Sequence, residues 1–199
     1  MKVLLTILGI ILPLILVGCG QSQETVTDKP TPPTTNTPIV IDNWSADGVI
    51  SDKEYSNNVH YGNFELYWSN DDQYIYIGIK VQTLGWLAFG IQPGLKMKDA
   101  DMIVGFVQER KVYIFDHFST GDFGPHNEDT ELGGTNDIFE YGGSEDEGFT
   151  TIEFMRELDT GDGWDIPLTK GPNKIIWAFG TNDGSGFKHT TRGYGEIIL

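Results

Sequence analysis

The sequence predicts an all-β domain built as a β-sandwich, and three observations lead to that prediction. Short apolar segments rich in aromatic and β-branched residues recur at close spacing. Glycines, 25 in the whole chain, separate many of these segments and mark turns. No segment keeps the 3.6-residue periodicity of an amphipathic helix over ten positions. Many short strands without a long helix are typical of an all-β sandwich.

The first predicted strands form a hairpin. Apolar and polar side chains alternate over residues 64–68, which indicates a half-buried strand. An acidic turn follows at 70–72, and residues 74–81 return as YIYIGIKV with their isoleucines and Val81 on one face. This pattern is typical of two antiparallel strands joined by a tight turn.

The remaining chain alternates strands with turns and two long loops. Glu109 and Arg110 form a tight turn between two strands. The strands after the hairpin are predicted at 85–91, 101–108, 111–116, 138–141, 150–154, 174–179 and 196–199. The long loops are predicted at 118–137 and 158–168. Loops of this length at the rim of a sandwich are where binding sites are usually built.

The N-terminus is predicted to be processed and anchored. Lys2 precedes an apolar run over 3–17, which is too short for a spanning helix and fits a secretory signal. Leu16-Val17-Gly18-Cys19 resembles a bacterial lipobox, which implies a lipoprotein signal peptide at 1–18 and a diacylated Cys19. The alternative is an ordinary membrane anchor that keeps its helix.

A tether is predicted between this anchor and the folded domain. Residues 19–38 are rich in Thr, Pro and Gln and nearly free of large apolar side chains, so they cannot bury enough surface to fold. The folded domain is expected at 39–199, lipid-anchored to the cell membrane on its extracytoplasmic side.

Charge and cysteine content exclude several kinds of function. The formal net charge is -16, so phosphate backbones repel the chain and nucleic acid is excluded as a partner. A basic redox protein of the envelope would instead be attracted. Cys19 is the single cysteine, which excludes disulfides, Cys-based zinc sites, iron–sulfur clusters and covalently attached haem in the folded domain.

Met97 stands alone among polar residues in the loop after the strand that begins at Gly85. Turn chemistry does not require a methionine there. Its thioether is either a small hydrophobic plug or a soft ligand for a metal centre. The residue alone leaves both readings open.

The order of several motifs resembles the DOMON domain family. These are GWLAFGI, the following Met, ADMIVGFV, VYIFD, an Arg-x-Leu-Asp-Thr-Gly-Asp segment, and IIWAFG before a His. The resemblance covers the whole folded part and implies an immunoglobulin-like antiparallel β-sandwich. In the haem b-binding members, a Met after the Gly-Trp strand and a His near the C-terminus hold the iron. Met97 and His189 occupy these two positions.

Neighbouring residues complete the expected haem site. Trp86 and Phe187 flank the two ligands and are expected to wall a porphyrin, and Arg192 or Lys188 to meet a propionate. Met102 and Met155, in contrast, fall in strand patterns and are predicted to be core residues. His60, His117 and His126 match no family position.

Two functions follow from the resemblance. The first is an electron carrier with Met/His-ligated haem b and a redox partner in the envelope, rather than a complete enzyme. The second is a haem-free module that binds carbohydrate or another extracellular ligand, with Trp44, Trp68 or Trp164 as stacking platforms. The same tryptophans are also candidates for the core.

Two acidic segments invite a metal, and solvated or turn-forming roles are favoured for both. Asp159, Asp162 and Asp165 suggest calcium, but their spacing does not fit the EF-hand loop. The second segment combines His117 and His126 with acidic neighbours, namely Asp116, Asp122, Glu128 and Asp129.

Overall fold

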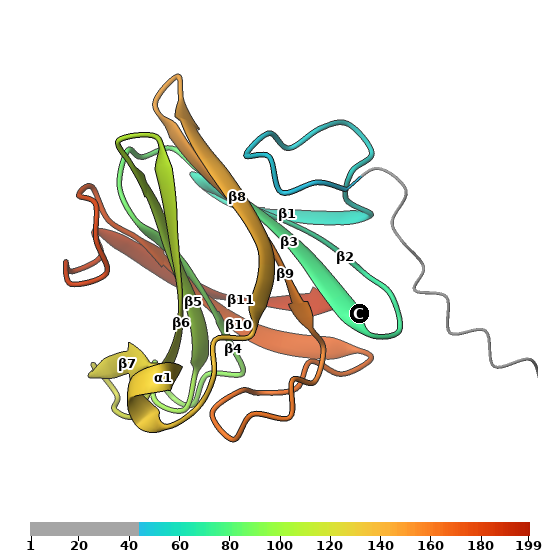
Figure 1. Cartoon of the computed structure of the whole chain (residues 1–199), viewed down its shortest axis with the longest axis vertical. Helices are drawn as coiled ribbons and strands as arrows, with labels where there is room; N and C mark the ends of the chain where they lie inside the picture. The colour runs from blue at the N-terminus through green and yellow to red at the C-terminus, as the bar shows by residue number, and fades with distance from the viewer. Residues whose placement is uncertain (1–43) are drawn as a thin grey trace, which may run out of the picture. The chain divides into compact units, whose positions relative to one another are not determined.

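The computed structural model describes residues 44–199, and these form a sandwich of two antiparallel β-sheets (Figure 1). The predicted all-β fold is therefore confirmed. The predicted signal peptide, Cys19, the tether and residues 39–43 lie outside the described residues. Among residues 44–199, no helix is long and apolar enough to cross a membrane.

The five-stranded sheet has the order β1-β2-β3-β9-β8. Its strands are β1 (Asn57–Tyr61), β2 (Phe64–Asn70), β3 (Tyr74–Val81), β8 (Ile138–Asp146) and β9 (Phe149–Glu157). The six-stranded sheet has the order β11-β10-β4-β5-β6-β7. Its strands are β4 (Leu87–Ile91), β5 (Asp101–Gln108), β6 (Lys111–Ser119), β7 (His126–Glu128), β10 (Pro172–Phe179) and β11 (Thr191–Ile198). The short helix α1 (Asp129–Leu132) follows β7 directly, at one end of the sandwich (Figure 1).

The core lies between the two sheets and follows the alternation of side chains along the strands. On β3, the predicted inward face is confirmed, because Ile75, Ile77, Ile79 and Val81 are all buried in the core. The facing sheet contributes Leu87, Phe89 and Ile91 of β4, Ile103 of β5, and Ile175 and Phe179 of β10. Every second residue of these strands therefore points away from the core, onto the outer face of the six-stranded sheet.

The predicted strands at 74–81 and 101–108 match β3 and β5 residue for residue. Strands β1 and β7 were not expected, because both are short edge strands with few apolar residues. The segment 118–137, expected as one loop, contains the end of β6, β7 and α1. The non-glycine turn at Glu109 and Arg110 is confirmed, with φ angles of 51° and 64°.

Candidate functional site

A pocket of about 670 Å³, including the space at its open mouth, lies on the outer face of the six-stranded sheet. We call it the outer-face pocket. Three adjacent strands supply its floor of small and apolar side chains: Ala88 and Gly90 of β4, Met102 and Val104 of β5, and Ile176 and Ala178 of β10. The part of this space that can hold the centre of a water-sized sphere is about 80 Å³, below the roughly 300–1,000 Å³ of preformed ligand pockets.

Strand register explains why this floor is flat. Ala88 lies opposite both Ala178 and Val104, and Gly90 lies opposite both Ile176 and Met102. Residues directly opposite each other in antiparallel strands share a face, so these side chains form two rows across the sheet. A Cβ atom at Gly90 would approach Cγ1 of Ile176 to 2.7 Å. Glycine at this position therefore avoids a clash with Ile176 and adds no side chain to the pocket floor.

Met97 reaches the pocket from the loop between β4 and β5 and is half-buried. The backbone N–H of Ala100 donates to the Met97 carbonyl at 3.1 Å, and the N–H of Asp99 donates to the Ser119 carbonyl at 2.8 Å. An ion pair of 3.2 Å between Lys96 Nζ and an Asp122 carboxylate oxygen adds a contact to the segment after β6. These contacts fix the loop that presents the thioether.

His189 reaches the same pocket from the connection between β10 and β11. The next residue, Thr190, donates its backbone N–H to the Phe179 carbonyl at 2.9 Å, which ties this end of the connection to β10. Burial, and then the positive charge of Arg192, lower the pKa of the His189 imidazole. The neutral imidazole is the form that binds metals.

The other residues predicted for the site divide between the pocket and the surface. Trp86, which is buried, and Arg192 line the outer-face pocket. Phe187 is 54% exposed, and neither it nor Lys188 is among the lining residues. Met102, predicted to be a core residue, is buried with 6% exposure, and its side chain lies on the outer face of the sheet, where it forms part of the pocket floor. Met155 is half-buried and lies outside the core cluster.

His126 is a pocket residue that the sequence did not indicate. It is half-buried, lines the outer-face pocket, and its Nδ1 lies 3.1 Å from Nδ1 of His117. Burial lowers the pKa of both imidazoles, that of His117 to about 4. Strand β7 explains the position of His126, because it pairs with β6 and places His126 opposite Ser119. From the sequence alone, without knowledge of that pairing, the segment 118–137 is predicted to be a solvated loop.

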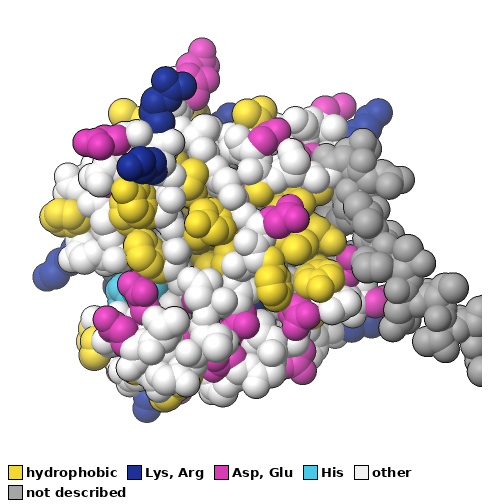
Figure 2. Space-filling view, in the orientation of Figure 1, with side chains coloured by type: hydrophobic (Ala, Val, Ile, Leu, Met, Phe, Trp, Pro, Cys, Tyr) yellow, Lys and Arg dark blue, Asp and Glu magenta, His cyan; other side chains and the backbone are white. Residues whose placement is uncertain are grey.

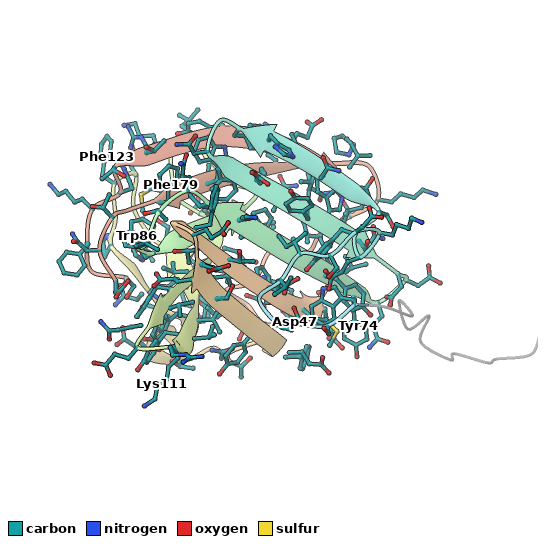
Figure 3. All side chains as sticks on the ribbon, turned by 90° about the horizontal axis from the view of Figure 1, so that it is seen from above. Asp47, Tyr74, Trp86, Lys111, Phe123 and Phe179 are labelled. Atoms are coloured by element: carbon teal, nitrogen blue, oxygen red, sulfur yellow. The ribbon has the colours of Figure 1, made fainter. Side chains whose placement is uncertain are left out.

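The tryptophans expected as stacking platforms have other roles. Trp68 is only 6% exposed and belongs to the core, which is the second role that the sequence allows for it. Trp44 donates its indole N–H to the Tyr55 hydroxyl at 2.8 Å, and Trp164 packs on the Phe118 ring with centroids 5.3 Å apart. Trp86 is 6% exposed, whereas Phe123 is 73% exposed and projects at the edge of the domain (Figure 3).

A second polar site lies inside the sandwich. Arg156 of β9 is 1% exposed, and its Nη1 donates to both carboxylate oxygens of Asp101 on β5, at 2.9 and 3.1 Å. Its Nη2 lies 3.3 Å from Oδ2 of Asp165. Arg156 thus connects the two sheets through a buried ion pair. We call the buried acids at this end of the sandwich the interior acidic cluster: Asp101, Asp116, Asp129 and Asp165.

This arrangement corrects the expectations for both acidic segments. Asp159 and Asp162 accept backbone N–H bonds in the loop after β9, as expected for turn residues, whereas Asp165 is buried beside Arg156. In the other segment, Asp116 and Asp129 are buried rather than solvated, and Asp122 is exposed and pairs with Lys96.

Electrostatics set the interior acidic cluster apart from ordinary surface acids. Burial, the largest cause in each case, raises the pKa of Asp101 to about 6, of Asp116 to about 7 and of Asp129 to about 8. Repulsion from neighbouring carboxylates adds to the rise, and Arg156 opposes it at Asp101 and Asp116. Strongly perturbed acids of this kind are frequent at functional sites.

Comparisons with known proteins agree with the fold and identify the family. The DOMON domain family matches residues 60–180. DBH-like monooxygenase protein 1 is 31% identical over 122 residues in Mus musculus and 30% identical over 142 residues in Homo sapiens. These matches cover 61% and 69% of this chain, which spans only about a fifth of the relatives, 19% and 22% of their lengths.

Two solved structures share the fold at low sequence identity. The cytochrome domain of Myriococcum thermophilum cellobiose dehydrogenase has a TM-score of 0.51 and 14% identity, over 68% of this chain and 74% of that one. The cytochrome b domain of pyranose dehydrogenase from Coprinopsis cinerea has a TM-score of 0.50 and 17% identity, over 67% and 74%. With the family match, the two-sheet architecture and the motif order in agreement, the chain belongs to the DOMON domain family.

Proposed function

We propose that this chain binds b-type haem in the outer-face pocket, with Met97 and His189 as axial ligands, and works as an electron-transfer module. One observation carries the proposal: two residues of the right chemistry, far apart in the sequence, line the same pocket. The resemblance of the fold to two cytochrome domains supports it.

The lining fits the group. A floor of alanine, glycine and branched aliphatic side chains suits the apolar face of a flat macrocycle, and Trp86 adds an aromatic wall. Arg192 and Lys96 are the basic residues of the lining and would meet the propionates through charge-assisted hydrogen bonds. Haem held by these residues would supply one-electron exchange.

The proposal stops short of an enzyme activity. The relatives are named monooxygenases, but this chain spans about a fifth of their lengths. The electron partner in the proposal is a protein of the cell envelope with a basic face, because this chain is strongly acidic. Figure 2 shows acidic side chains spread over one face of the domain.

The membrane anchor belongs to the proposal as well. It rests on the lipobox resemblance at Cys19 and the tether composition, both outside the described residues. Incorporation of labelled palmitate into the native chain, and its loss in Cys19→Ala, is the expected result. A Cys19→Ala chain that remains lipid-labelled would contradict the proposed lipidation of Cys19 and would leave the haem proposal unaffected.

The haem proposal is tested by spectroscopy on the purified full-length chain after addition of haemin. We expect sharp low-spin bands on reduction, which Met97→Ala and His189→Ala each abolish or convert to a high-spin form. Met155→Leu and His60→Ala are the matched controls, because both residues lie outside the pocket, and they should leave the spectrum unchanged.

His126→Ala distinguishes two ligand sets. Because His126 lines the same pocket, a spectrum lost in this variant but kept in His189→Ala would assign the imidazole ligand to His126. Absence of low-spin bands in the unmodified protein would remove the haem proposal altogether. The domain would then bind a ligand other than haem, which is the second function that the sequence allows.

A further inference from the structure

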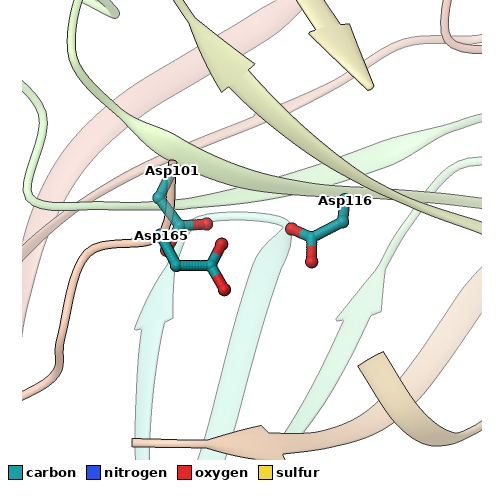
Figure 4. Close-up of side chains that lie close together, drawn as sticks. All are labelled: Asp101, Asp116 and Asp165. Carbon is teal, nitrogen blue, oxygen red and sulfur yellow. The ribbon is translucent and has the colours of Figure 1, made fainter. Parts of the chain in front are cut away.

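The interior acidic cluster brings three carboxylates together from three separate segments. Asp101 lies on β5, Asp116 on β6 and Asp165 in the loop after β9 (Figure 4). Oxygens of all three lie within 4.8 Å of one another, and none of the residues is more than 7% exposed. The cluster lies on the inner face of the six-stranded sheet, because Asp101 and Asp116 alternate with Met102 and His117 on the outer face.

The negative charge of this cluster exceeds the positive charge next to it. Asp129, 0% exposed at the start of α1, is a fourth buried carboxylate, and the Asp116 charge repels it. Among the described residues, Arg156 is the cation that forms ion pairs with the cluster. It contacts both carboxylate oxygens of Asp101 and one of Asp165. Buried carboxylates need a counter-charge or hydrogen bonds, and one guanidinium cannot balance four of them.

Several carboxylate oxygens are also without hydrogen bonds. Among the described residues, Oδ1 of Asp116 and both oxygens of Asp129 and of Asp165 have no hydrogen-bond donor, although Oδ2 of Asp165 lies 3.3 Å from Nη2 of Arg156. Asp116 does use its other oxygen, which accepts the backbone N–H of Asp137 at 3.0 Å. Asp101 is fully engaged by Arg156 and by the N–H of Ile166 at 2.9 Å. The unpaired oxygens are therefore concentrated on Asp116, Asp129 and Asp165.

We propose that the interior acidic cluster binds a calcium ion, with Asp116 and Asp165 as carboxylate ligands and Asp129 as a third acidic group beside them. Calcium–oxygen distances of about 2.3 to 2.6 Å place ligands on opposite sides of the ion about 4.6 to 5.2 Å apart. The 4.8 Å spread of the carboxylate oxygens fits this coordination sphere.

The chemistry of the cluster selects calcium over other metals. All candidate side-chain ligands are carboxylate oxygens, which hard cations prefer and softer transition metals do not require. Magnesium demands near-ideal octahedral geometry and keeps several waters, whereas calcium accepts irregular shells that include backbone carbonyls. The ion would join β6, α1 and the loop after β9. This inference is independent of the haem proposal, since the two sites lie on opposite faces of the sheet.

The test uses the purified full-length chain, freed of metal with a chelator and dialysed. At a calcium concentration about a hundred times its Kd, the melting temperature is expected to rise by about 5 to 10 °C. Magnesium at the same concentration should give a much smaller rise. Terbium should show luminescence sensitised by Trp164, the neighbour of Asp165, and calcium should displace it.

Two pairs of variants locate the ion. Asp116→Asn and Asp129→Asn should each weaken calcium affinity at least tenfold. They should not lower the melting temperature of the metal-free chain, because each replaces a carboxyl group whose charged form is disfavoured by burial and by its acidic neighbours. Asp159→Asn and Asp162→Asn are matched controls in the exposed part of the loop and should retain wild-type affinity. Met97→Ala and His189→Ala should also bind calcium normally, which separates this site from the haem proposal.

Three results would overturn the inference. A melting temperature that calcium does not change would mean that protons and Arg156 alone neutralise the cluster. Equal loss of affinity in the control variants would place the ion on the surface. Preference for magnesium over calcium would exclude the irregular oxygen shell on which the assignment depends.

Discussion

Replacing Arg156 by Met is expected to destabilise the domain far more than removal of an exposed ion pair. The substitution keeps an apolar side chain of similar length but leaves Asp101, which is 0% exposed, without its two guanidinium hydrogen bonds. Breaking a buried pair from one side typically costs about 3 to 5 kcal/mol. For a domain of this size, that loss lowers the melting temperature by about 6 to 20 °C.

Urea unfolding at pH 7, followed by tryptophan fluorescence, measures this cost as a shift of the midpoint at constant slope. The matched control is the exposed pair of Lys96 and Asp122, whose side chains are 44% and 49% exposed. Lys96→Ala should cost about 0 to 1 kcal/mol. The double variant Asp101→Asn/Arg156→Met should recover part of the stability, because the uncompensated charge is then gone. A loss below 1 kcal/mol for Arg156→Met, equal to the control, would refute the argument.

Three further predictions concern acidity, the pocket and a glycine. First, metal-free protein should lose stability as the pH rises from about 6.5 to 8. Burial raises the pKa of Asp116 to about 7 and of Asp129 to about 8, so the folded state holds protons that the unfolded state releases near pH 4. The buried histidines have lowered pKa values and act in the opposite direction only below about pH 6.5, so they leave this window unaffected. Urea midpoints measured across the window should fall, and a flat profile, or an equal fall in Asp116→Asn/Asp129→Asn, would contradict the assignment. Second, Ala88→Phe should fill the floor of the outer-face pocket and weaken haemin binding at least tenfold, at a cost to stability of no more than about 1 to 3 kcal/mol because Ala88 is buried beside Trp86 and Val104; undiminished binding would place the haem elsewhere. Third, Gly142→Ala should cost about 2 kcal/mol or more, because its Cβ would collide with the Ala46 carbonyl, whereas Gly163→Ala, with open space around it, should cost less than about 1 kcal/mol in the same unfolding assay.

The sequence predicts the strands of the core well because their residues carry a two-residue alternation that burial imposes. Strands β3 and β5 could be placed to the residue on this basis. Edge strands carry less of that signal, since one side of each is unpaired and few of their side chains reach the core. This is why β1, with the sequence NNVHY, and β7, with HNE, could not be recognised.

The residues of the candidate sites also differ in how far the sequence predicts them. Met97 and His189 could be selected from motif order, but only the fold places their loops over one pocket. His126 could be named only as part of an acidic segment and not as a residue of this pocket, because its position depends on the pairing of β7 with β6. Nor does the sequence reveal the burial of Asp101 and Arg156, since a strand that ends in a charged residue normally ends in solvent.

The two proposed sites share the strand pair β5 and β6, and strand alternation separates them. On β5, Asp101 faces the interior acidic cluster while its neighbour Met102 forms part of the pocket floor. On β6, Asp116 faces the same cluster while His117 contacts His126, a residue of the pocket lining. An ion that holds Asp116 in place therefore also restrains the strand that supports one edge of the pocket. Because the two faces share one backbone, calcium removal is expected to raise the Kd for haemin without altering either axial ligand. An identical Kd with and without calcium would show that the two faces act independently.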